Sequence, residues 1–144
     1  MALLRATILL LVYGMSCSAA ACDHKCPTSA NELQCVLKHC PAVYRENPEY
    51  FWGVLNRARN DAFSCDSVNK TAEFLRIVRL PRMGADLQEY VSEGIETLCV
   101  KQPVCFKKAM NALDEKTQHA VKVKLGNPIY FDASDLAICL GHDK

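Results

Sequence analysis

The sequence predicts an all-α fold, a small disulfide-rich bundle of about five to seven short helices. Three observations lead to this prediction. Apolar residues recur with helical spacing along most of the chain, capping residues and prolines separate these segments, and nine cysteines occur within 144 residues. Hydrophobic residues make up 50% of the chain, which is enough for a core in one domain of this size.

The first 21 residues have the pattern of a secretory signal peptide. Arg5 precedes an apolar run, and a stretch of small residues follows it. The alternative is a membrane anchor, but such a short run covers only about half of a ~30 Å hydrocarbon core. We therefore expect cleavage after Ala20 or Ala21, no transmembrane segment after cleavage, and a secreted, extracellular protein with residues 22–144 as a single domain.

The cysteine count also indicates an oxidising compartment. Cys17 lies within the expected signal peptide, and its removal from the nine cysteines leaves an even set of eight. An even set in a short secreted chain is typical of a disulfide framework, here of four bridges with no free thiol. The expected bridging residues are Cys22, Cys26, Cys35, Cys40, Cys65, Cys99, Cys105 and Cys139.

A capping box predicts the first helix. The side chains of Ser29 and Glu32 can each accept a hydrogen bond from a free backbone N–H at the helix start. Apolar residues then recur at i, i+3, i+4 and i+7 as far as Cys40. Pro41 is expected to end this helix, because proline has no N–H to donate.

The second helix is expected to start after Asn47, a good N-cap that precedes a proline, and to run to Cys65. Tyr50, Phe51 and Trp52 are consecutive on it, so their side chains point about 100° apart. With Phe51 in the core, we expect Trp52 or Tyr50 to be partly exposed and to bind a partner, since both residue types are common interface anchors. The alternative is that they belong to the edge of the core.

These two helices should pack as an antiparallel hairpin. Cys40 and Cys65 would then lie roughly 15 Å or more apart, beyond the about 7 Å that a disulfide allows between Cα atoms. We therefore expect Cys65 not to pair with Cys40. The partners expected instead are Cys22, Cys26 or Cys35 for Cys65, and Cys99, Cys105 or Cys139 for Cys40.

Three more helices are predicted in the middle of the chain. The third runs from Asn69 to Leu80 and ends before Pro81. The fourth begins at Asp86 and has the clearest amphipathic pattern, and the fifth follows a turn at 101–103. The expected inner stripe of the fourth helix is Leu87, Tyr90, Val91, Gly94, Ile95 and Leu98.

Asn69 also begins the triplet Asn69-Lys70-Thr71, an acceptor for N-linked glycan. A glycan would occupy the amide nitrogen of Asn69 and leave the side-chain oxygen free to cap the third helix. We therefore expect Asn69 to be a surface residue that can fill both roles.

The segment after the fifth helix has two interpretations. We favour a helix over 117–125 that is capped by Thr117 and closed by Gly126. The alternative is a small β-hairpin near 120–131, because apolar residues alternate with lysines before a Gly-Asn-Pro turn. A last short helix over 134–140 should be held by its cysteine.

Charge and motifs argue against several functions. The chain has 17 basic and 16 acidic residues, so no strong overall field favours nucleic acid. Cys22, His24 and Cys26 mix the residue types that bind zinc, but their spacing does not fit the common zinc sites. The chain has no hydrolase or phosphate-loop motif. We therefore expect no enzyme, metal or cofactor.

The expected function is that of a secreted, non-catalytic interaction protein, similar in role to a toxin, an effector or a pheromone, that binds an extracellular or cell-surface protein. The alternative is an extracellular carrier of a lipid or small hydrophobic ligand. Bulky residues that should fill the core disfavour a large cavity, namely Phe51, Phe74, Leu87, Tyr90, Phe106 and Met110.

Overall fold

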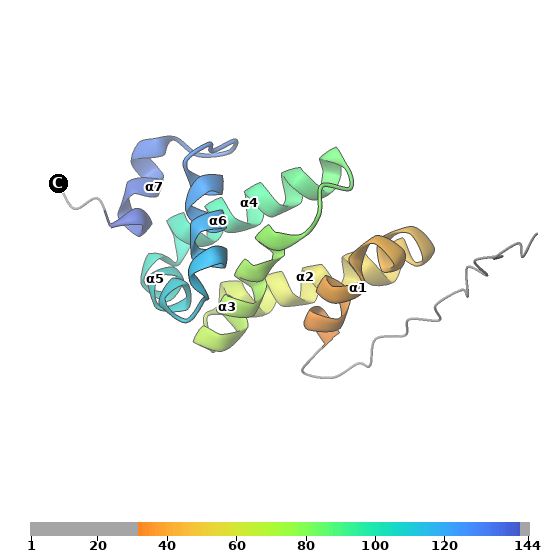
Figure 1. Cartoon of the computed structure of the whole chain (residues 1–144). Helices are drawn as coiled ribbons and strands as arrows, with labels where there is room; N and C mark the ends of the chain where they lie inside the picture. Colours follow the sequence, from red (N-terminus) through yellow and green to blue (C-terminus); the bar gives the residue numbers. More distant parts are fainter. Residues whose placement is uncertain (1–31, 142–144) are drawn as a thin grey trace, which may run out of the picture.

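The computed structural model describes residues 32–141 (Figure 1). This part of the chain is all-helical and contains no strand, so the predicted fold class is confirmed and the alternative hairpin near 120–131 is wrong. The helices are α1 (Glu32–Glu46), α2 (Pro48–Ser64), α3 (Val68–Leu75), η1 (Arg76–Arg79, a 3-10 helix), α4 (Ala85–Lys101), α5 (Pro103–Asn111), α6 (Glu115–Leu125) and α7 (Ala133–Leu140).

The first helix does not end at Pro41, as the sequence had suggested. Proline disturbs the helix before it, because its ring clashes with the preceding turn. In α1 this disturbance is confined to a kink at His39, whose φ of −108° and ψ of 17° are not helical. A second helical segment then continues to Glu46 with Pro41 near its start, a position where proline is tolerated.

The predicted antiparallel hairpin of α1 and α2 is present. Glu32 at the start of α1 contacts Arg57 in the second half of α2, at 2.9 Å. The ring of Tyr44 near the end of α1 lies 5.2 Å from that of Phe51 near the start of α2. Asn47 caps α2 as predicted, since its side-chain oxygen accepts a 3.1 Å hydrogen bond from a backbone N–H of the first turn.

The third helix differs from its prediction at both ends. It begins at Val68 after Ser67, so Asn69 lies within the first turn and is not the N-cap. The α-helix ends at Leu75 and continues as the tighter η1 as far as Arg79. Leu80 then takes an extended conformation, as expected for a residue before a proline.

The Phe74 side chain of α3 reaches the fourth helix at Gly94. A Cβ atom at this position would lie only 2.8 Å from Cζ of Phe74, so the ring fits against α4 in this position because residue 94 lacks a side chain. The predicted stripe faces the core, with Tyr90 half-buried and its other members buried. The N-cap is Gly84, and Asp86 lies in the first turn.

A capping aspartate explains why residues 115–125 form a helix. Asp114 accepts a hydrogen bond from the backbone N–H of Thr117 at 3.0 Å and one from the Thr117 hydroxyl at 2.7 Å. Asp114, and not Thr117, is therefore the N-cap of α6.

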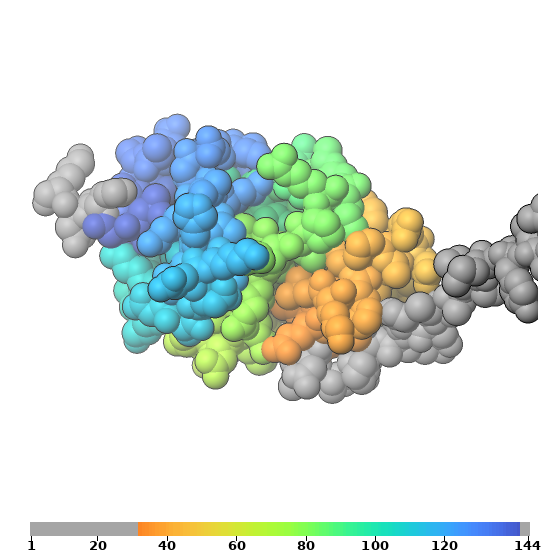
Figure 2. Space-filling view, viewed as in Figure 1, coloured from red at the N-terminus to blue at the C-terminus, as the bar shows by residue number. Residues whose placement is uncertain are grey.

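The α6–α7 pair, in blue, forms one end of the molecule, and α1, in orange, lies towards the other end (Figure 2).

Two disulfides join helices that are distant in sequence, Cys65 to Cys105 and Cys99 to Cys139, with Cα atoms 6.2 and 5.6 Å apart. Cys35 is also disulfide-bonded. The predicted signal peptide and the expected bridging residues Cys22 and Cys26 lie outside the described residues. The fold therefore contains cysteines in the oxidised, disulfide-bonded form.

The predicted pairings need correction, although Cys65 indeed does not pair with Cys40. Cys65 pairs with Cys105 because α3, which follows it, packs on α5. Cys40 is free and buried on the inner side of α1, so the expectation that it bridges to the second half of the chain is wrong. Its Sγ contacts Sδ of Met83 at 3.8 Å.

Large side chains fill the core, as expected for a close-packed bundle. Phe51, Phe74 and Phe106 are fully buried and come from α2, α3 and α5. None of the described helices is long and apolar enough to span a membrane.

Candidate functional site

A buried carboxylate on α4 holds the loop between α6 and α7. Glu96 is fully buried, and its side chain accepts hydrogen bonds from three successive backbone N–H groups. The shortest distances to these nitrogens are 3.0 Å for Ile129, 2.8 Å for Tyr130 and 3.2 Å for Phe131. Successive N–H groups that converge in this way form a concave site for an anion, which is here supplied by the protein itself.

This arrangement offsets the cost of burying a charge. An isolated carboxylate is expensive to remove from water, whereas one that accepts several hydrogen bonds is tolerated. Burial lowers the pKa of Lys124, and the negative charge of Glu96 acts in the opposite direction. The backbone of the loop is therefore fixed from its inner side.

The outer side of the same loop exposes two large side chains. Ile129 is 59% exposed and Tyr130 is 47% exposed. Partial burial, followed by the negative charges of Glu89, Glu93 and Glu96, raises the pKa of Tyr130. Exposed apolar residues are also present on the adjoining helices, with Val123 on α6 and Ile138 on α7. The loop thus presents an exposed apolar pair on which the charges of acidic side chains act.

Trp52 and Tyr50, the sequence-predicted partner residues, are both half-buried. The Trp52 ring packs edge-on against the rings of Tyr44, Phe51 and Tyr90, at centroid distances of 6.2, 5.3 and 5.3 Å. The Tyr50 hydroxyl donates a 3.1 Å hydrogen bond to Glu32. These contacts connect α2 with α1 and α4. A role of Trp52 or Tyr50 in partner binding stays a prediction.

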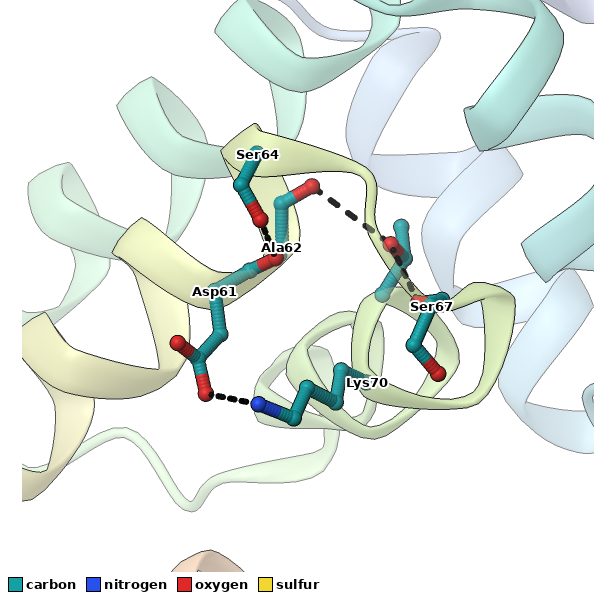
Figure 3. Close-up of polar contacts among 6 residues, drawn as sticks. Asp61, Ala62, Ser64, Ser67 and Lys70 are labelled. Atoms are coloured by element: carbon teal, nitrogen blue, oxygen red, sulfur yellow. Dashed lines mark hydrogen bonds and ion pairs between the residues drawn. The ribbon is translucent and has the colours of Figure 1, made fainter.

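Asn69 is exposed, as predicted, and lines a groove of about 500 Å³ between α1, α2 and α3. Ion pairs cross this groove, Arg57 to Glu32 and Lys70 to Asp61, both at 2.9 Å. The second pair is visible in Figure 3. A groove with charged walls of this kind does not suit the apolar tail of a lipid. Among the described residues, no group of three or more His, Cys, Asp or Glu side chains is arranged to hold a metal ion.

The sequence reasoning missed Glu96, although the helical spacing contained a signal. Glu96 lies four residues after Ser92 and three before Cys99, so the three share one face of α4. A cysteine expected to bridge marks that face as buried. An acidic residue on a buried face needs a dedicated partner.

Comparison of the chain with protein-family models, with curated proteins and with solved structures gives no match.

Proposed function

We propose that this chain is a secreted, non-catalytic binding protein that recognises another extracellular or cell-surface protein through the 129–130 loop. The observation that supports the proposal is a pair of exposed apolar side chains on a backbone that Glu96 fixes from below. A fixed backbone loses little conformational entropy on binding, so the free energy of apolar contact is retained. Tyrosine is also among the residues that most often dominate interfaces.

The acidic surroundings indicate the character of the partner surface. The negative charges of Glu89 and Glu93 act on Tyr130, that of Glu93 being offset in part by its 3.1 Å ion pair with Arg59, and they disfavour a negatively charged partner. We therefore expect an apolar pocket with Lys or Arg at its rim. Association should weaken as the salt concentration rises, because exposed charges are screened.

A binding assay on cells tests this proposal. Labelled protein is expected to bind saturably, and prior trypsin treatment of the cells should abolish binding if the receptor is a protein. The double variant Ile129→Ser with Tyr130→Ser should bind at least tenfold more weakly.

The matched control is Val104→Ser on α5, which removes another exposed apolar side chain, 66% exposed, away from the loop. Its binding should equal that of the wild type. Equal binding by the loop variant and the wild type would show that the partner binds elsewhere, and trypsin-resistant binding would indicate a lipid instead of a protein.

A further inference from the structure

We propose that Asn69 accepts its N-linked glycan only before the chain folds, because the native structure closes the acceptor triplet. The three residues of the triplet have different environments. Asn69 and Lys70 are exposed, but Thr71 is fully buried. The side chain that would carry the sugar is thus accessible, whereas the hydroxyl that defines the triplet as an acceptor is not.

The Thr71 hydroxyl lies in a closed polar pocket. It is 3.2 Å from the carbonyl oxygen of Ser67 and 3.4 Å from that of Ala62. On its third side, Sγ of Cys105 lies at 3.4 Å. Figure 3 shows the end of α2 and the start of α3 around this pocket, with the Ala62 and Ser67 contacts drawn as dashed lines. An enzyme that must contact this hydroxyl would have to displace all three groups.

The backbone of the triplet is fixed as well. Its residues form part of the first turn of α3, and Lys70, the middle residue, pairs with Asp61 of α2 at 2.9 Å. The Cys65–Cys105 disulfide joins the chain just before α3 to α5, on which α3 packs. The triplet can therefore become extended only if α3 opens, and buried helices open rarely.

The transfer reaction takes place at the side-chain amide of Asn69. The amide nitrogen of Asn69 forms a bond to C1 of the first sugar of a lipid-pyrophosphate-linked oligosaccharide. The bond between C1 and the phosphate oxygen breaks, the lipid pyrophosphate leaves with the electron pair, and the amide proton passes to a base of the transferase. Because Thr71 is enclosed in the folded chain, transfer has to precede the folding of α3 against α2. This inference depends on entry into the secretory pathway and is independent of the proposed binding loop.

A transfer assay on two forms of the full chain tests the order of events. Unglycosylated protein is used either folded and oxidised or reduced and alkylated, with eukaryotic microsomal oligosaccharyltransferase and its lipid-linked donor. Mass spectrometry of the Asn69 peptide should show transfer to the unfolded form and at least about tenfold slower transfer to the folded form. Similar rates for the two forms would overturn the proposal, and so would the absence of transfer to either.

The chain offers a matched control. In a variant with Asn69→Gln and Asp132→Asn, a new triplet arises with Ala133 and Ser134, all three positions being exposed. Residue 132 is the N-cap of α7, with φ of −71° and ψ of 151°, and residues 133 and 134 lie in its first turn, so the new triplet shares the helical start of the native one and differs in the exposure of its third residue. The folded variant should accept glycan about as fast as the unfolded one. Equal blockage of this open triplet would mean that burial of Thr71 is not the cause.

Discussion

The Glu96 carboxylate on α4 accepts a 2.8 Å hydrogen bond from the backbone N–H of Tyr130, 34 residues later in the chain. Glu96 is fully buried, whereas the Tyr130 side chain is 47% exposed. This hydrogen bond therefore attaches the backbone of a surface loop to a buried side chain of the core. The conformation of the candidate binding site depends on one charged side chain that no partner would touch.

Replacement of this carboxylate should loosen the loop. In Glu96→Gln, one oxygen becomes an NH₂ group that faces backbone donors, and the charge that strengthens the hydrogen bonds is lost. We expect the free energy of unfolding to fall by about 2–4 kcal/mol. Chemical denaturation measures this loss, and hydrogen exchange of the amides of residues 129–131 should become much faster.

Glu93→Gln is the matched control on the same helix. Glu93 pairs with Arg59 at 3.1 Å, but its side chain is 44% exposed, so the expected loss is below about 1 kcal/mol. Similar losses in the two variants would contradict the anchoring role of Glu96.

Two glycine substitutions should have opposite effects. Gly94→Ala places a methyl group 2.8 Å from the Phe74 ring, and we expect a loss of about 1–3 kcal/mol because both residues are buried. Gly53→Ala on α2 meets only Arg57, at an ordinary 3.5 Å, and should gain up to about 1 kcal/mol from the higher helix propensity of alanine. Thermal denaturation distinguishes the two. A stabilising Gly94→Ala would mean that the Phe74 ring does not lie this close to residue 94.

Cys40 should be protected from alkylation. It is fully buried, and burial raises the pKa of its thiol to about 11 from an ordinary value of 9.0. We expect iodoacetamide at pH 8 to modify it only after denaturation, as judged by mass spectrometry of its peptide. Failure to label Cys40 in the denatured, unreduced protein would indicate a bridged residue, as the sequence had suggested.

The same thiol should make stability depend on alkaline pH. Above pH 9 the unfolded chain loses the Cys40 proton while the folded chain retains it up to about pH 11, so stability falls over this range. Between pH 8 and pH 10 the wild type should lose about 1 kcal/mol more than Cys40→Ala. Urea denaturation at the two pH values tests this, and identical losses would exclude a buried neutral thiol.

Trp52 should matter more for stability than Tyr50. Trp52→Ala removes contacts with three aromatic rings, and we expect a loss of about 2–3 kcal/mol. Tyr50→Phe removes only the hydroxyl that contacts Glu32 and should cost below about 1 kcal/mol. If binding follows the folded fraction in both variants, these residues serve the core and not a partner.

Helical periodicity was a reliable guide to the inner face of each element. The stripe of α4 and the hairpin of α1 and α2 follow from spacing alone, because burial of an apolar face dominates packing. The boundaries depended on weaker local effects. Pro41 kinks α1 and does not end it, and Asp114 caps α6 where Thr117 had been expected. Such choices differ by only a few kcal/mol.

Long-range relationships were harder to predict. The Cys65–Cys105 pairing depends on the packing of α3 on α5, which neither segment reveals by itself. The Glu96 site joins a side chain to backbone N–H groups, and every residue except proline carries such a group. Sequence could therefore indicate that Glu96 needs a partner, but not that the partner would be the 129–131 backbone.

These two disulfides, Cys65–Cys105 and Cys99–Cys139, affect how the protein responds to proteolytic cleavage. Each spans 40 residues, and their loops overlap between Cys99 and Cys105. A single backbone cut anywhere from Cys65 to Cys139 therefore leaves both pieces covalently attached. A nick in an exposed connection, such as the candidate binding loop, would not release a fragment, and the mass of the clipped molecule would increase only by that of one water until its disulfides were reduced.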